Sequence, residues 1–129
     1  MKLLVCGGRT YGQRVGESDT LDRALSAFAS GHDVTLVVHG AARGADSLAG
    51  EWARLHGVDV VEYPAEWNKY GRSAGFKRNK QMLDAESPDW VIAFPGGTGT
   101  NMMVNLALQA GVPVWRVRFN KLVRITQEI

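Results

Sequence analysis

Runs of consecutive apolar residues recur along the chain, and the spacing between them leaves room for a helix in each gap. They are Lys2–Cys6, Val34–His39, Val58–Tyr63, Trp90–Phe94 and Val112–Val117. In most of these runs the apolar residues are continuous rather than alternating, which is typical of parallel strands covered on both faces. The pattern predicts five buried strands.

Apolar residues at helical spacing occupy the segments between these runs. The predicted helices lie around Leu21–Phe28, over Ala45–Leu55, around Phe76–Leu83 and from about Thr98 to Ala110. Strands and helices in strict alternation favour an α/β fold with right-handed crossovers. We therefore expect residues 1–129 to form one domain, a Rossmann-like doubly wound parallel sheet of about five strands with helices on both faces.

Two further features concern the edge of the sheet and the oligomeric state. The tail Arg116–Arg124 alternates basic and apolar residues, which suits either an edge strand or a docking arm. The fourth predicted helix is apolar almost all round, so we expect it to be buried by its own sheet and by a partner subunit in a homodimer.

Composition narrows the class of protein. The chain has 129 residues, a hydrophobic fraction of 45% and a formal net charge of +2, which suits an anionic ligand and argues against a nucleic-acid partner. The single cysteine and the absence of a leader pattern or a long apolar stretch favour a cytoplasmic location without membrane insertion. His32, His39 and His56 lack metal-ligand spacing, so we expect no metal and no cofactor.

Two glycine-rich loops follow predicted strands and open predicted helices. The first contains Gly7, Gly8 and Arg9, and the second is Pro95–Thr100, with hydroxyls at Thr98 and Thr100. Glycines let backbone N–H groups approach an anion, and a helix N-terminus adds a positive dipole end. A tight turn without a ligand explains one such loop, whereas two of them favour a nucleotide-like phosphate site.

A third loop follows the second predicted strand and contains Gly40, Arg43, Gly44 and Asp46. Arg43 can bind phosphate through two N–H groups. Asp46 either interacts with the helix dipole or accepts hydrogen bonds from a ribose or a base.

The segment Glu66–Asn79 is too long and too aromatic for a plain connection, so it is a candidate for function. Trp67 and Tyr70 either stack on a base or pack over the end of the sheet. Asn79 shares a helical face with apolar residues, so its amide either ties down a neighbouring loop or meets a ligand.

With these motifs the whole chain resembles the SLOG superfamily of Rossmann-like nucleotide-binding domains, and most closely its branch related to YspA and cpYpsA. The resemblance implies a site for a nucleotide or nucleotide-derived ligand. The residues it points to are Gly7, Gly8, Arg9, Tyr11, Gly40, Arg43, Gly44, Asp46, Arg78, Asn79, Pro95, Gly96, Gly97, Thr98, Gly99 and Thr100.

Two relatives within this resemblance imply different functions. The LOG phosphoribohydrolases share the second glycine loop, but their catalytic Glu matches Met103 here. A carboxylate stabilises an oxocarbenium-like transition state and a thioether does not, so a binding or sensing module is favoured over a hydrolase. Asp46 or Glu66 are the candidates to replace that acid.

The DNA-processing A family shares the Ala42–Asp46 pattern and the Arg78-Asn79 pair, which implies single-stranded nucleic acid as a second alternative. The low net charge favours the binding module over that alternative as well.

Overall fold

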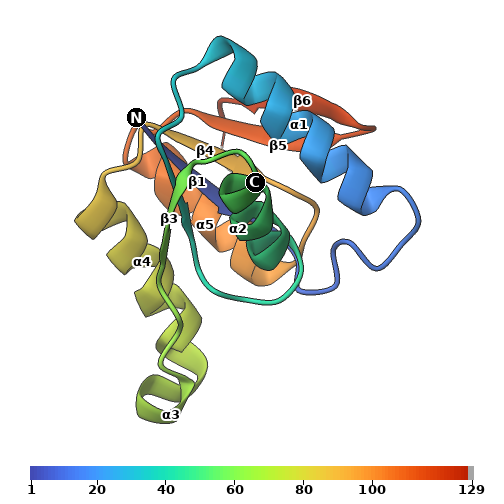
Figure 1. Ribbon diagram of the computed structural model, residues 1–129. Helices are drawn as coiled ribbons and strands as arrows, with labels where there is room; N and C mark the ends of the chain where they lie inside the picture. Colours follow the sequence, from blue (N-terminus) through green and yellow to red (C-terminus); the bar gives the residue numbers. More distant parts are fainter. Residues whose placement is uncertain (128–129) are drawn as a thin grey trace.

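The computed structural model describes residues 1–127 as one α/β layer structure (Figure 1). Its elements, in chain order, are β1 (Lys2–Cys6), α1 (Glu17–Gly31), β2 (Leu36–His39), α2 (Ala45–Leu55), β3 (Asp59–Glu62), α3 (Trp67–Tyr70), η1 (Gly71–Ser73), α4 (Ala74–Glu86), β4 (Trp90–Ala93), α5 (Thr98–Gln109), β5 (Val114–Arg118) and β6 (Lys121–Ile125). The five predicted strands are all present, most of them shorter at their ends.

The strands form one sheet in the order β3-β2-β1-β4-β5-β6. The first five are parallel to their neighbours, and β6 pairs with β5 in the antiparallel sense. Because the chain moves outward from β1 to β3 and then returns to place β4 on the other side of β1, strand order reverses between β1 and β4. Ligands of such sheets bind at this switch point, outside the carboxyl ends of the strands.

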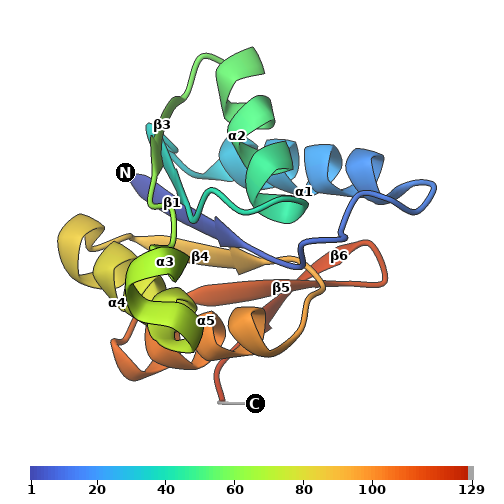
Figure 2. The same cartoon turned by 90° about the horizontal axis from the view of Figure 1, so that it is seen from below.

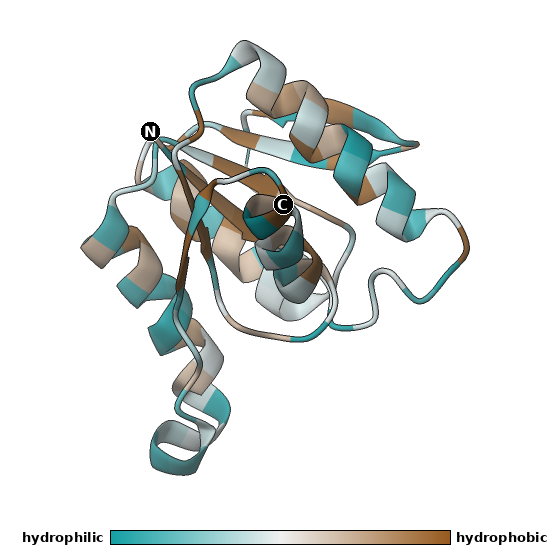
Figure 3. Ribbon diagram, in the orientation of Figure 1, coloured by the Kyte–Doolittle hydropathy of each residue, from teal (hydrophilic) through white to brown (hydrophobic). Residues whose placement is uncertain are grey.

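Helices cover both faces of the sheet (Figure 2). On one face α1 and α2 pack on a cluster that includes Leu25, Phe28 and Trp52. On the other face α4 and α5 pack on a cluster that includes Met82, Met103 and Val104. The central strands are correspondingly the most hydrophobic part of the ribbon (Figure 3). This arrangement confirms the predicted doubly wound fold.

The tail of the chain is an edge strand, one of the two alternatives for it. Residues 121–125 form β6, a sixth strand at the edge of the sheet, joined to β5 by a turn at Phe119 and Asn120, both with positive φ. Leu122 packs against the apolar cluster on one face of the sheet and Ile125 against the cluster on the other, whereas Lys121, Val123 and Arg124 are exposed. Among residues 1–127, no helix has the length and apolar character needed to span a membrane.

Candidate functional site

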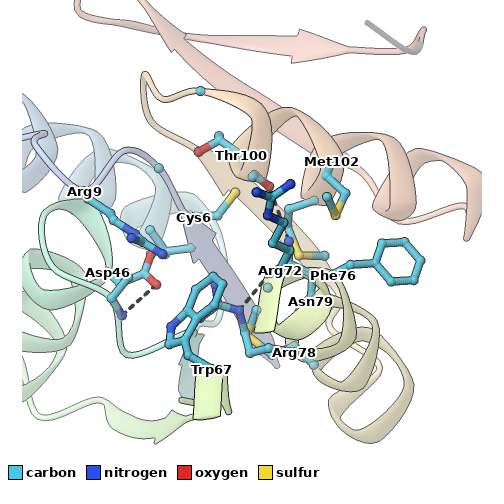
Figure 4. Close-up of a pocket in the computed structure, with 18 residues that line it drawn as sticks. Cys6, Arg9, Asp46, Trp67, Arg72, Phe76, Arg78, Asn79, Thr100 and Met102 are labelled. Carbon is cyan, nitrogen blue, oxygen red and sulfur yellow. Dashed lines mark hydrogen bonds between the residues drawn. The ribbon is translucent and has the colours of Figure 1, made fainter. Parts of the chain in front are cut away.

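A cleft of about 450 Å³ opens at the carboxyl ends of the central strands (Figure 4). Its walls come from the loops after β1, β2 and β4, from the α3–α4 segment and from the first turns of α5. Its charged lining residues are Arg9, Asp46, Arg72 and Arg78. A smaller hollow of about 240 Å³ adjoins it and includes Arg43. The cleft therefore lies at the switch point that the topology indicates.

Gly8 joins the three strand-end loops to one another. Its N–H donates to the carbonyl of Pro95 at 2.9 Å, and its carbonyl accepts from the N–H of Ala45 at 3.2 Å. A Cβ on Gly8 would lie 2.9 Å from the Pro95 oxygen, and one on Gly44 would lie 2.2 Å from the Gly8 oxygen. These glycines are required for contact between loops.

Two other predicted glycines belong to the same tight packing. A Cβ on Gly7 would approach Ala45 to 2.5 Å, and one on Gly96 would lie 2.2 Å from the hydroxyl of Thr100. The N–H of Gly8 is already bonded within the protein, so this loop does not present that amide to an anion.

The N-terminus of α5 is open by contrast. A Cβ on Gly97 or on Gly99 would have no atom within 4 Å, and both residues line the cleft. No side chain of residues 1–127 caps this helix, so the first N–H groups of α5 lack a partner within it. These groups and the helix dipole make this end of α5 attractive to an anion.

The loop after β2 holds the buried carboxylate of Asp46. Its Oδ2 accepts from the N–H groups of Gly40 at 3.1 Å and Ala42 at 3.3 Å. Burial raises the pKa of Asp46 to about 6, while these two bonds and the nearby Arg78 and Arg9 oppose that rise. Asp46 is 5% exposed and is the one acidic residue among the cleft-lining residues described.

Arg78 and Asn79 bind the cleft walls together. The Arg78 guanidinium donates to the carbonyl of Gly40 and, at 3.0 Å, to the side-chain oxygen of Asn79. The Asn79 amide donates to the carbonyl of Gly99 at 3.3 Å. Through this pair α4 connects the loop after β2 with the start of α5, so Asn79 ties down a neighbouring loop, one of the two alternatives for it.

Arg9 and Trp67 meet across the mouth of the cleft. The guanidinium carbon lies 5.1 Å from the ring centroid, within the range of a cation–π contact. Both side chains are exposed, and Trp67 keeps 48% of its accessible surface. A planar ligand group can therefore reach either of them.

The predicted site residues fall into three groups. In the lining of the cleft lie Gly7, Arg9, Asp46, Arg78, Asn79, Gly97, Gly99 and Thr100. Beside the cleft, in the interlocked loops or the smaller hollow, lie Gly8, Gly40, Arg43, Gly44, Pro95 and Gly96, and Thr98 is the first residue of α5, between two lining residues. Tyr11 is apart from both groups, because it is buried in the core with its ring 5.4 Å from that of Phe94.

Several lining residues were not predicted from the sequence. Phe76 was expected on the buried face of its helix, but it keeps 45% of its surface and lines the cleft beside Arg72. Met102 lines it too. The signal in the sequence is that Phe76 lies within Glu66–Asn79, the long aromatic segment that is a candidate for function, but this does not show which of its side chains face the cleft.

Glu66, one of the two candidate replacement acids, lies outside the cleft lining and within 4.0 Å of Lys69. Among residues 1–127 no group of three or more His, Cys, Asp or Glu residues could hold a metal ion.

The strand order and the cleft at the switch point define a Rossmann-like α/β domain with a ligand cleft. The chain belongs to the YspA, cpYpsA-related SLOG family, whose sequence pattern matches residues 1–70. That match includes the loops after β1 and β2, whereas the loop after β4 lies beyond it.

Two individual proteins are similar to this chain. The Gene 61 protein of Mycobacterium phage D29 is 37% identical over 120 residues, which cover 88% of this chain and 93% of that protein. The crystal structure of UDP-GlcNAc 2-epimerase from Neisseria meningitidis bound to UDP-GlcNAc matches 91% of this chain with a TM-score of 0.51 and 18% identity. This chain spans 32% of the epimerase chain, and the likeness concerns the fold alone.

Proposed function

We propose that this domain binds a nucleotide or a nucleotide-derived phosphate ligand in the cleft and acts as a binding or sensing module. The observation that carries the proposal is the open N-terminus of α5, where Gly97 and Gly99 leave free space beside helix N–H groups. This end faces a cleft that holds three arginines and one carboxylate. A phosphate group matches both the helix dipole and the excess of positive charge.

The remaining walls suit the other parts of such a ligand. Trp67 and Phe76 present aromatic rings to the cleft, and Met82, Met102 and Met103 add apolar surface. Thioethers and aromatic rings pack well on a flat base. Arg72 is exposed, and so is Arg9, which contacts the ring of Trp67 and is available to a phosphate, whereas Arg78 is engaged with the Gly40 carbonyl and Asn79.

Thermal unfolding in the presence of AMP, ADP, GMP and free adenine tests this proposal. The nucleotides are expected to raise the melting temperature, because a ligand at a hundredfold excess over its Kd stabilises the native state by about 2.7 kcal/mol. Free adenine, which lacks the phosphate, is expected to have no effect. No shift with any nucleotide at millimolar concentration would contradict the proposal.

Gly97→Val locates the site. The new side chain enters open space, so the fold is expected to remain native by circular dichroism while the response to AMP disappears. Gly31→Val is the matched control, because a Cβ on Gly31 would also have no atom within 4 Å and this residue lies at the end of α1, outside the cleft lining. Retention of the AMP response in Gly97→Val would place the ligand elsewhere.

A second candidate function is hydrolysis of a nucleoside monophosphate, and the raised pKa of Asp46 favours it. A carboxyl with a pKa of about 6 inside the cleft is suited to general acid–base catalysis near neutral pH. Release of free base from AMP, lost in Asp46→Asn, would establish this activity. No release by the unmodified protein would leave the binding module.

We also expect a homodimer, and a location in the cytoplasm. Leu106 and Leu108 on α5 are only partly covered by the core cluster beneath them, which leaves apolar surface for a second copy. Sedimentation equilibrium measures the mass directly, and a monomer at micromolar concentration would exclude the dimer.

A further inference from the structure

His39 is a buried histidine that ends β2 directly before the loop Gly40–Gly44. His39 is 3% exposed, and the Nδ1 of its ring accepts a hydrogen bond from the backbone N–H of Ala41 at 3.0 Å. Because an imidazole nitrogen accepts only when it carries no proton, this bond assigns the neutral ring with its hydrogen on Nε2.

Ala41 is a residue that needs such support. Its φ is 57°, in the left-handed region that side chains other than glycine rarely adopt. The neighbouring N–H groups of Gly40 and Ala42 both donate to Asp46. Three successive N–H groups are therefore held by two side chains, His39 in the middle and Asp46 on either side.

The other side of the ring lacks a hydrogen bond. Among residues 1–127 the buried Nε2 has no hydrogen-bond partner, and the nearest carboxylate oxygen, on Glu62, is 3.9 Å away. Glu62 is itself paired with Arg54 at 3.0 Å. A Cβ on Gly50 would lie 2.8 Å from Nε2, so the glycine in α2 makes room for the ring. A buried N–H without a hydrogen-bond partner costs free energy, so the favourable polar interaction of this ring is the hydrogen bond at Nδ1.

We propose that His39 is a positioning residue of the cleft, which holds the loop Gly40–Gly44 in its binding shape while Nδ1 is unprotonated and releases it when Nδ1 takes a proton. A proton on Nδ1 removes the acceptor of the Ala41 N–H and sets two donors against each other. The left-handed Ala41 then loses its support, and the loop that carries Ala42 and leads into Asp46 loosens. This inference rests on the proposed function of the cleft and adds its regulation.

The charges around the ring determine when this release occurs. Burial lowers the pKa of His39, Glu62 from β3 opposes this, and Arg54 from α2 and Arg78 from α4 lower it further. The ring is therefore neutral at pH 7, and the loop loosens on acidification below the ordinary histidine range.

The other two histidines provide internal references. The Nδ1 of His32 lies 2.9 Å from the backbone carbonyl oxygen of Phe28, and the Nδ1 of His56 lies 2.8 Å from that of Trp52. A carbonyl only accepts, so in these residues Nδ1 carries the proton. One nitrogen-15 NMR spectrum at pH 7.5 is thus expected to show the Nε2–H tautomer for His39 alone.

The decisive variants are His39→Leu, which removes the acceptor, and His39→Asn, whose side-chain oxygen occupies a position close to Nδ1 and does not titrate. At pH 7.5 the Ala41 amide is expected to exchange with solvent at least tenfold faster in His39→Leu and at the wild-type rate in His39→Asn. Between pH 7.5 and 5 the exchange, corrected for its intrinsic pH dependence, should accelerate in the wild type and less in His39→Asn. His56→Asn, outside the cleft lining, is the matched control.

AMP is the binding probe. Its Kd is expected to rise at least tenfold in His39→Leu and to stay within twofold of wild type in His39→Asn and His56→Asn. A protonated Nδ1 on His39, or an Ala41 amide equally protected in His39→Leu, would overturn the inference. Unchanged AMP affinity in a His39→Leu protein with an unprotected loop would overturn it too. If the wild type itself fails to bind AMP, the proposed function fails, while tautomer and exchange still decide the role of His39.

Discussion

The loops after β2 and β4 both contain glycines, both open a helix, and both lie at the same cleft, yet they use their backbone in opposite ways. After β2 the N–H groups of Gly40, Ala41 and Ala42 are all bonded to side chains of the protein. After β4 the first turn of α5 lacks a side-chain cap within residues 1–127, and space is open beside Gly97 and Gly99.

The difference shows that a glycine-rich turn has two physical uses. Gly44 permits a close approach between backbones, and a side chain there would collide with Gly8. Gly97 and Gly99 keep a surface free for another molecule. The same residue type therefore stabilises the framework of the cleft in one loop and leaves the anion-binding end accessible in the other.

The strongest test of the comparison is Gly44→Ala. The new Cβ would lie 2.2 Å from the Gly8 carbonyl oxygen at a φ of +77°, so overpacking and backbone strain combine. We expect a loss of about 3–5 kcal/mol in the free energy of unfolding, measured by urea denaturation. Gly111→Ala is the control, because its φ is +76° with no atom within 4 Å, and it should lose only about 1–2 kcal/mol. Equal losses would show that the loops do not interlock.

Met103→Glu tests whether the accessible surface at the N-terminus of α5 extends as far as residue 103. Met103 lines the cleft but is 1% exposed, so a carboxylate there loses most of its hydration and should destabilise the fold by about 3 kcal/mol. Met102→Glu, at a partly exposed neighbouring position that also lines the cleft, should change stability by less than about 1 kcal/mol. Base release from AMP by a stable Met103→Glu protein would show instead that this position faces the ligand.

Asp46, which accepts hydrogen bonds from the loop after β2, should make the stability of the protein depend on pH. Its folded pKa of about 6 exceeds its ordinary value of 3.8, so the folded state binds the proton more tightly between these values. As the pH falls, protonation of Asp46 therefore raises the free energy of unfolding, and this contribution is absent above pH 7. A buried neutral histidine has the opposite effect, because its protonation lowers the free energy of unfolding. The stability of wild type relative to Asp46→Asn should rise by about 2 kcal/mol between pH 7 and pH 4. A flat difference would mean that burial does not raise this pKa.

Gly99→Ala is the mildest change and separates binding from folding. Alanine is favoured over glycine within a helix, so the free energy of unfolding should rise by up to about 1 kcal/mol. The methyl group also enters the space beside the first N–H groups of α5, so the affinity for AMP should fall about tenfold. Unaltered affinity would show that the ligand avoids this end of α5.

Much of the fold was predictable from local patterns. Continuous apolar runs predicted all five parallel strands, and Ala45–Leu55 coincides with α2 as observed. The glycine loops followed the strands that flank the switch point, so the position of a candidate site was predictable as well. These features depend on neighbours in sequence, and apolar periodicity records directly which residues are buried.

The tertiary structure alone decided what each residue at the site does. The sequence does not distinguish Gly44 from Gly97, because the Gly8 carbonyl that excludes a side chain at Gly44 comes from a different loop. Likewise Phe76 has the spacing of a core residue yet lines the cleft, and Tyr11 adjoins a glycine loop yet is buried against Phe94. Local periodicity determines the elements, whereas roles at the cleft depend on which atoms of distant segments meet when the sheet brings their loops to one edge.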